Sequence, residues 1–250
     1  MPRFYCPQPL AVGLTIDLPD TVAHHAHVLR LQAGAELCLF NGDGADYSAQ
    51  LVAVDKRRAS ARIAARSVRD AELPYAITLA QALPEGSKMD WIIEKAVEMG
   101  VAAIAPLAAQ RCVVRLSGER AEKKAAHWQG VIVAASEQCG RNRLARLGAL
   151  EDFSGWIARH RAPGTEVDHT APITRLLLSP RGTQTLADWA RQQPPQAISL
   201  LIGPEGGFTA QEEEAALAAG ALALTMGPRV LRTETAGIAA VAMLQGLWGA

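Results

Sequence analysis

The chain has 250 residues, of which 49% are hydrophobic and 20% charged, and its 25 basic and 25 acidic side chains cancel. This length allows one large domain or two modest ones. Zero net charge excludes a molecule that attracts polyanions through its overall field. No apolar stretch reaches membrane-spanning length, and the first five residues contain no apolar signal core, so we expect a cytoplasmic protein without membrane association.

The residues that commonly bind metals are not arranged as metal sites. The four cysteines, Cys6, Cys38, Cys112 and Cys139, form no C-x-x-C pair and have no His or Cys at zinc-ligand spacing. A histidine cluster at 24–27 likewise lacks an acidic or cysteine partner. We therefore expect reduced thiols that pack as small hydrophobic side chains, and no metal.

Basic side chains are concentrated between Arg111 and Arg146. This segment carries eight basic and three acidic residues, a local excess of five positive charges. Such a surface can neutralise phosphates. A solvated helix face is the more frequent explanation when charge is the only observation.

The first 70 or so residues predict a small β-barrel of five or six strands. Alternating apolar and polar residues indicate half-buried strands, and Gly and Asp residues supply turns between them. One short helix is expected at 22–29. The expected strands include 15–18, 36–40, 47–54 and 59–68.

A polar stretch that ends at Pro74 predicts a domain boundary, with one domain at 1–72 and a second at 73–250. Strands and helices alternate after it, which predicts an α/β fold with a mostly parallel sheet. The expected strands are 76–83, 101–107, 175–179, 198–202 and 222–226. The expected helices are 88–99, 119–138, 151–161, 186–192, 209–219 and 233–248, with Thr209 and Glu212 in capping-box positions.

Two glycine-bearing segments follow expected strands near the C-terminus. The first, Leu201-Ile-Gly-Pro-Glu-Gly-Gly207, leads from a buried strand into a helix. Ligands of open α/β sheets bind at the carboxyl ends of strands, where glycines let the backbone approach a ligand closely. Its spacing fits neither G-x-G-x-x-G nor the P-loop, which disfavours NAD and ATP. An ordinary loop is the alternative.

The second segment, Gly227-Pro-Arg-Val-Leu-Arg-Thr-Glu-Thr235, carries two arginines and a glutamate. Thr233 or Thr235 is a candidate cap for the last helix, and Glu234 suits the positive end of that helix. Arg232 is a natural contact for an anion or RNA. The two segments could close around one small ligand.

Together these motifs resemble the SPOUT class of methyltransferases, and within it the RsmE family of 16S ribosomal RNA uridine-N3 methyltransferases. The resemblance covers essentially the whole chain. The family commonly has an acidic or histidine-containing version of the segment at 179–181, where this chain has Ser-Pro-Arg, and we assign no site residue there. The matching motifs are Lys95-Ala-Val-Glu98-Met-Gly100-Val101, Ser136-Glu137-Gln138-x-x-Arg141, the two C-terminal segments, and His24-x-x-x-Val28-Leu29-Arg30 followed by Gly34.

The resemblance implies a SPOUT methyltransferase domain with a C-terminal trefoil knot, preceded by a PUA-like RNA-binding β-barrel. It also implies a homodimer that binds S-adenosyl-L-methionine and acts on 16S ribosomal RNA or the small ribosomal subunit. Knots are otherwise nearly absent from proteins. The implied cofactor-binding residues are Leu178, Leu201, Gly203, Pro204, Glu205, Gly206, Gly207, Met226, Gly227, Leu231, Arg232, Thr233, Thr235 and Ala236.

The implied reaction is attack of uridine N3 on the sulfonium methyl group, for which N3 must lose its proton. Arg232 could stabilise the uridine anion, and either Glu234 or Glu137 could accept the proton. Glu205 could contact the cofactor or hold its loop. Lys95 and Glu98 fit exposed or paired helix positions. The expected RNA-binding residues are Arg30, Gln138, Arg141 and Arg143.

Two other functions remain compatible with the sequence. One is an RNA-binding dimer without catalysis, although the intact glycine loop and the intact Leu231–Thr235 segment argue against a decayed enzyme. Calorimetry with S-adenosylmethionine separates the two, since the non-catalytic protein would show no binding. The other is a SPOUT methyltransferase that acts on tRNA or on a ribose hydroxyl.

Overall fold

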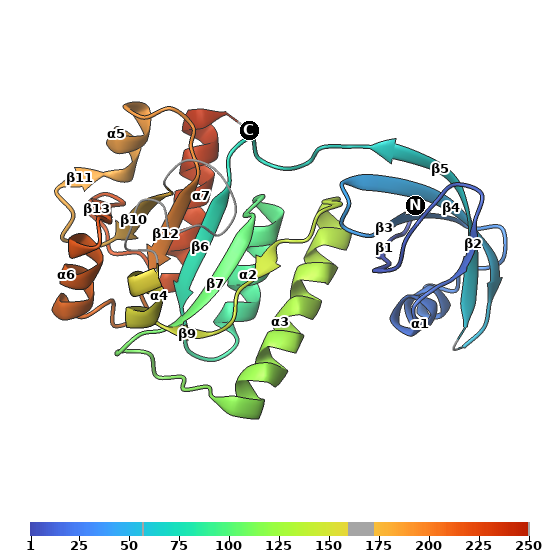
Figure 1. Ribbon diagram of the computed structural model, residues 1–250, viewed down its shortest axis with the longest axis horizontal. Helices are drawn as coiled ribbons and strands as arrows, with labels where there is room; N and C mark the ends of the chain where they lie inside the picture. Colours follow the sequence, from blue (N-terminus) through green and yellow to red (C-terminus); the bar gives the residue numbers. More distant parts are fainter. Residues whose placement is uncertain (57, 160–172, 250) are drawn as a thin grey trace. The chain divides into compact units, whose positions relative to one another are not determined.

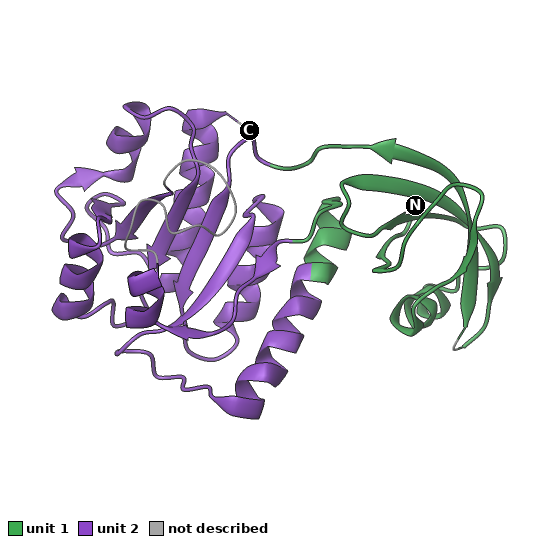
Figure 2. Cartoon of the chain, in the orientation of Figure 1, with its two compact units in different colours: residues 1–72, 133–144 green, residues 73–132, 145–250 purple. Residues whose placement is uncertain are grey.

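The computed structural model describes residues 1–56, 58–159 and 173–249, and the chain divides into two compact units. Unit 1 comprises residues 1–72 and 133–144, and unit 2 comprises residues 73–132 and 145–250 (Figure 2). The chain passes from unit 1 to unit 2 between Glu72 and Leu73, within the polar stretch that predicted a domain boundary. The segment 133–144 groups with unit 1, because it contacts the N-terminal strands.

Unit 1 is a five-stranded sheet of order β1-β3-β4-β5-β2 with one helix. Its large buried side chains, such as Phe4, Leu39 and Ile63, form the core of this unit. Strand β1 was not predicted; it pairs in parallel with β3. The elements are β1 (Arg3–Tyr5), β2 (Thr15–Asp17), α1 (Asp20–Val28), β3 (Glu36–Phe40), β4 (Ala45–Val54) and β5 (Ala59–Val68).

Unit 2 is an α/β unit around a fully parallel sheet, as predicted, with the order β11-β13-β10-β12-β6-β7-β8 and with β9 also paired to β7 (Figure 1). Its strands are β6 (Ile77–Ala82), β7 (Ala103–Ala108), β8 (Arg146–Leu147), β9 (Glu151–Asp152), β10 (Thr174–Leu178), β11 (Gln184–Thr185), β12 (Ile198–Ile202) and β13 (Leu222–Thr225). Its helices are α2 (Lys88–Glu98), α3 (Gly118–Cys139, which ends in unit 1), α4 (Phe153–Arg159), α5 (Leu186–Arg191), α6 (Ala210–Ala218) and α7 (Thr233–Trp248).

The helices of unit 2 form two groups. Helix α7 packs against α2 and α5 and lies on β12 and β6, whereas α4 packs against α6 and β7. All five residues of β12 are buried, as expected for a central strand covered on both faces. The end predicted for α4, Arg161, lies outside the described residues. In the described part of the chain, no helix is both long and apolar enough to span a membrane.

The helix ends show which capping predictions were correct. Thr209 and Glu212 form the predicted capping box at the start of α6. The predicted cap of α7 was wrong: the N-cap residue is Arg232, without a side-chain cap hydrogen bond, and Thr233 forms other contacts described below. Lys95 pairs with Glu94 and Glu98, as expected for a surface helix position.

Asp90 connects α2 to α3 within unit 2. Its carboxylate accepts a hydrogen bond from Trp128 Nε1 at 3.1 Å and lies 3.3 Å from Lys124 Nζ and 2.7 Å from His127 Nε2. Burial by itself raises the pKa of Asp90, but the hydrogen bonds from His127 and Lys124 outweigh it and hold the pKa below its ordinary value. Asp90 is thus a charged anchor for the first half of α3.

We expect Asp90→Ala to lower the free energy of unfolding of unit 2 by about 2 kcal/mol at pH 7, because it removes charge-assisted hydrogen bonds. All five tryptophans lie in unit 2, so urea unfolding followed by tryptophan fluorescence reports on this unit. Since the folded-state pKa is lowered, the stabilisation is present above the unfolded pKa of about 4 and is lost as the pH falls further. Glu94→Ala, which removes an exposed ion pair, is the control and should change stability by less than about 0.5 kcal/mol.

Candidate functional site

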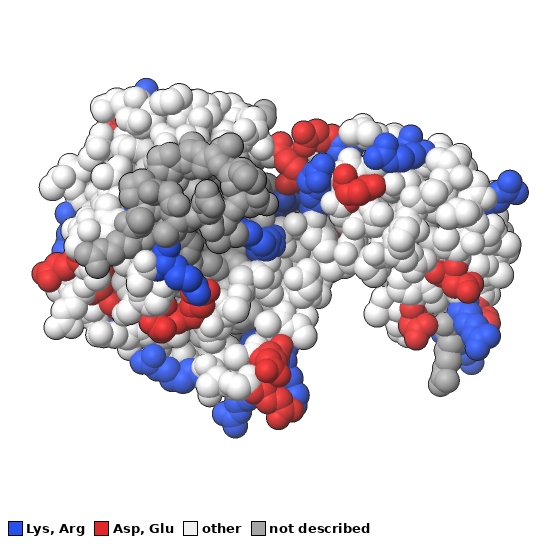
Figure 3. All heavy atoms as spheres, viewed as in Figure 1, with Lys and Arg blue, Asp and Glu red and all other residues white. Residues whose placement is uncertain are grey.

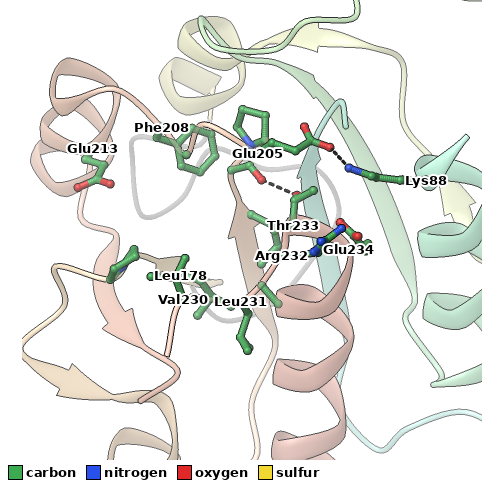
Figure 4. A pocket seen from close by; sticks show the side chains of 16 residues that line it. Lys88, Leu178, Glu205, Phe208, Glu213, Val230, Leu231, Arg232, Thr233 and Glu234 are labelled. Carbon is green, nitrogen blue, oxygen red and sulfur yellow. Dashed lines mark hydrogen bonds and ion pairs between the residues drawn. The ribbon is translucent and has the colours of Figure 1, made fainter. Parts of the chain in front are cut away.

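The carboxyl ends of three neighbouring strands, β13, β10 and β12, lie at the same end of the parallel sheet. Ligands bind at the carboxyl ends of strands in such folds. A cavity of about 320 Å³ lies at this end, within the usual size range of small-molecule sites. We call it the loop pocket (Figure 4). Its lining residues are Lys88, Leu178, Pro180, Ile202, Gly203, Pro204, Glu205, Gly207, Phe208, Glu213, Val230, Leu231, Arg232, Thr233, Glu234 and Ala236.

The glycine-bearing loop after β12 depends on its glycines. A Cβ atom on Gly203 would lie 3.0 Å from the backbone N of Phe208 and 3.1 Å from backbone atoms of Gly207, so any side chain would force the loop open. Gly207 has φ +67°, a conformation that L side chains rarely adopt. The Arg111 guanidinium donates to the carbonyl of Gly206 at 2.7 Å and holds the loop from outside the pocket.

Thr233 joins the two C-terminal segments. Its hydroxyl donates to the carbonyl of Gly203 at 2.6 Å and accepts a hydrogen bond from Gln81 Nε2 at 2.9 Å. The residue is only 5% exposed. These hydrogen bonds connect the start of α7 to the loop after β12 and to β6. The two C-terminal segments, 201–207 and 227–235, therefore line the same pocket.

Charged side chains of opposite sign gather at one side of the loop pocket. Lys88 Nζ lies 2.5 Å from Glu205 Oε1, which also accepts the backbone N–H of Glu85 at 3.1 Å. Burial raises the pKa of Glu205, but the Lys88 ammonium and the Glu85 N–H outweigh it, so the pKa lies below its ordinary value. Glu205 thus carries its charge at neutral pH and holds its loop to the residues around Lys88.

Arg232 and Glu234 lie on the same side of the pocket as Lys88 (Figure 4). Arg232 is exposed at the N-cap of α7, and Glu234 lies in the first turn of this helix. The Oε2 atom of Glu234 is buried and has no hydrogen-bond partner among the described residues. A buried carboxylate oxygen without a partner is costly. Glu234 also lines the pocket, so its side chain is a candidate to accept a proton there.

Glu213 on α6 lies at the opposite side of the pocket from Arg232 and Glu234 (Figure 4). Its carboxylate accepts a hydrogen bond from Ser179 Oγ at 3.2 Å and lies 3.5 Å from Arg181 NH1. The Ser-Pro-Arg sequence in which this chain departs from the family pattern therefore holds an acidic side chain at the pocket.

Nine of the fourteen predicted cofactor-binding residues line the pocket, together with the predicted catalytic residue Glu234. The nine are Leu178, Gly203, Pro204, Glu205, Gly207, Leu231, Arg232, Thr233 and Ala236. The other five, Leu201, Gly206, Met226, Gly227 and Thr235, are not among the lining residues. Sequence reasoning missed Lys88, Pro180, Ile202, Phe208, Glu213 and Val230. Lys88 begins the helix after β6, so the strand-end rule could have indicated it.

The other predicted site residues belong to unit 1. Glu137 Oε1 accepts the backbone N–H of Tyr5 at 2.9 Å, and burial raises the pKa of this carboxyl. Arg141 is 3% exposed, with both its Nε and NH2 bound to Glu72, at 3.0 and 2.5 Å. The remaining three, Arg30, Gln138 and Arg143, are exposed.

The surface charge is mixed. Basic and acidic side chains are interspersed on the face seen in Figure 3, in agreement with the balanced composition. No group of three or more His, Cys, Asp or Glu side chains in the described ranges could hold a metal ion. On this face the charge distribution thus directs attention to individual charged residues.

The chain matches two family models. Residues 71–245 match a family described as an RNA methyltransferase domain, and residues 18–64 match an RNA methyltransferase PUA domain. Over 250 residues the chain is 30% identical to the ribosomal RNA small subunit methyltransferase E of Buchnera aphidicola subsp. Schizaphis graminum, covering 100% of this chain and 97% of that protein. The protein of the same name from Mycobacterium bovis is 33% identical, with 93% and 91% covered.

Solved structures agree with these matches. The ribosomal RNA small subunit methyltransferase E of Neisseria gonorrhoeae, bound to S-adenosyl methionine, is 41% identical with a TM-score of 0.90, covering 99% of this chain and 98% of that one. A Legionella pneumophila methyltransferase in complex with the cofactor SAM is 37% identical with a TM-score of 0.88, covering 98% and 96%. Fold and matches together define an RNA methyltransferase with an N-terminal PUA domain. The chain belongs to the ribosomal RNA small subunit methyltransferase E family.

Proposed function

We propose that the protein transfers a methyl group from S-adenosylmethionine to N3 of a specific uridine in 16S ribosomal RNA. The observation that carries this proposal is the loop pocket, formed at the strand ends of a fold shared at a TM-score of 0.90 with a family member bound to S-adenosyl methionine. The substrate, ribosomal RNA, would place the reaction in the cytoplasm.

The residues of the loop pocket suit this cofactor. Leu178, Ile202, Leu231 and Ala236 offer apolar contacts for an adenine ring, and the glycine loop brings its backbone close to the cavity. Glu213 offers an acceptor for the hydroxyl or amino groups of the cofactor. When bound, S-adenosylmethionine supplies a methyl group on a positively charged sulfur, which is an electrophile.

The side chains near α7 would prepare the nucleophile. Uridine N3 carries a proton at neutral pH and becomes nucleophilic when this proton is lost. Glu234 is the better supported of the two candidate bases, because it lines the pocket. Glu137 already accepts the N–H of Tyr5 and does not line this pocket. Arg232 would stabilise the negative charge that spreads to the uracil oxygens.

The finer architecture also belongs to this proposal. We propose a trefoil knot formed by the segment from β13 through α7; the hydrogen bonds of Thr233 to the loop after β12 and to β6 support it. We further propose a homodimer, supported by the 79% exposure of Val230 beside the pocket, where an apolar side chain is available to a partner. Arg30, Gln138 and Arg143 would contact the RNA.

The test is methylation of small ribosomal subunits from a strain that lacks the modification. The purified protein and S-adenosylmethionine should add one methyl group, located by mass mapping at N3 of one uridine. Small-subunit RNA that remains unchanged would contradict the substrate assignment, and a methyl group on a ribose or on tRNA would move the protein to another class of methyltransferase.

We expect Arg232→Ala to reduce methyl transfer by about 10²–10³-fold, the effect of removing one donor to a developing oxyanion. Arg232 is exposed at the N-cap of α7 and makes no side-chain cap hydrogen bond, so folding should be preserved. Single-turnover rates at saturating cofactor measure the effect, and circular dichroism checks the fold. Near-normal turnover would remove Arg232 from the mechanism.

A further inference from the structure

Lys88 is a pocket residue to which none of the family motifs assigned a role. It is the first residue of α2 and extends from the carboxyl end of β6 toward the loop pocket (Figure 4). Its ammonium lies 2.5 Å from Glu205 Oε1 and interacts electrostatically with Glu234 and Glu85. Lys88 is therefore held at the side of the pocket that contains Arg232 and Glu234.

The ammonium of Lys88 retains hydrogen-bonding capacity. A lysine ammonium carries three N–H donors, and Glu205 is its one hydrogen-bond acceptor among the described residues. About a third of the side chain is exposed, at 31%, so a ligand in the pocket can reach the group. Two donors are thus available at the side of the pocket that contains Glu234.

The arrangement of charges matches the base-pairing edge of uracil. That edge presents an acceptor, a donor and an acceptor: O2, N3–H and O4. A carboxylate and two cations offer the complementary acceptor and donors, and Glu234, Lys88 and Arg232 bring these groups together at one side of the pocket. Cytosine presents a lone pair at N3 and an amino group beside it, and both would meet a group of the wrong kind.

We propose that Lys88, positioned by Glu205, is a catalytic residue that donates a hydrogen bond to one carbonyl oxygen of the target uracil while Arg232 donates to the other. The inference rests on the proposed function. In the step it assists, the N3–H bond breaks and an O–H bond forms on Glu234. The electron pair stays on N3 and spreads to O2 and O4, where the two cations stabilise it.

The experiment compares Lys88→Gln with Lys88→Arg, and with Lys123→Gln as a matched control at a lysine that is 75% exposed. We would measure S-adenosylmethionine affinity by calorimetry and single-turnover methylation of unmodified small subunits as a function of pH. Lys88→Gln should lower the saturated rate by about 10²-fold, as for loss of one oxyanion donor, with cofactor affinity within about threefold. Lys123→Gln should behave as the wild type.

The pH profile separates catalysis from loop support. The charged groups that face Lys88 are Glu205, Glu234 and Glu85. Loss of the ammonium removes a positive charge that favours the anion of the bound uracil, so it raises the pKa of uracil N3. The rate of Lys88→Gln should therefore rise at a higher pH than that of the wild type, and Lys88→Arg should restore the profile. Weaker cofactor binding with an unchanged saturated rate and pH profile would overturn the inference and leave Lys88 a structural role. An inactive wild type would instead overturn the proposed function.

Discussion

Glu234→Gln is expected to lower the methyl-transfer rate by about 10²–10⁴-fold, the range for loss of a general base. Glutamine has nearly the same shape but cannot accept a proton. Glu234 lies in the first turn of α7 and lines the loop pocket, and its Oε2 has no partner in the described structure. The change removes no hydrogen bond that Glu234 accepts from a described residue, so the protein should stay folded and bind cofactor within about threefold of the wild type.

The measurement is single-turnover methylation of small subunits at saturating S-adenosylmethionine. Glu214→Gln on α6, an exposed glutamate, is the matched control and should leave the rate unchanged. Glu137→Gln tests the other candidate base. A rate loss in Glu137→Gln that exceeds the loss in Glu234→Gln would transfer the role of base to Glu137.

The regular elements could be predicted because their signals are local. Strand β12 has four apolar residues and one serine and is buried throughout, and the bounds of α7 agree with the prediction at both ends. The capping box at Thr209 needs only a threonine and a glutamate three residues apart. By contrast, β8, β9 and β11 have two residues each and carry no periodicity. They are strands because a neighbouring strand pairs with them.

The site was predicted where one segment supplies it and missed where distant segments meet. The glycine loop and the start of α7 are continuous motifs, and both line the pocket. Lys88 and Glu213 lie 125 residues apart in the sequence. Both line the pocket because the sheet places β6, β12 and β10 side by side. Thr233 resembled a helix cap in sequence, but its partner is the carbonyl of Gly203, thirty residues away.

Arg141 shows a further limit of motif reasoning. In the Glu137-Gln138-x-x-Arg141 motif it was expected to bind RNA, a natural role for an arginine in a basic segment. Its side chain is instead 4% exposed and paired with Glu72, and its carbonyl accepts a hydrogen bond from Arg3. The partner lies 69 residues away, so the sequence could not reveal that this guanidinium is already bound.

We therefore expect Arg141→Ala to lower the stability of unit 1 by about 3 kcal/mol, the lower end of the range for breaking a buried ion pair, because Glu72 keeps some exposure to water. Tryptophan fluorescence does not report on this unit, since all five tryptophans lie in unit 2. Hydrogen–deuterium exchange does: peptides from β3, β4 and β5 should exchange faster, while those from β6 and β12 should not change.

Arg143→Ala is the matched control, because Arg143 is exposed two residues further along the chain. Its substitution should leave exchange in β3–β5 unaltered and weaken RNA binding. The slope of log affinity against log salt concentration should become shallower by about one, the change for one lost phosphate contact. Arg141→Ala should show the reverse pattern, with faster exchange and an unchanged salt dependence at temperatures where unit 1 stays folded. If Arg141→Ala reduced the salt dependence and left exchange unaltered, Arg141 would be an RNA contact and its ion pair with Glu72 would be dispensable for the fold.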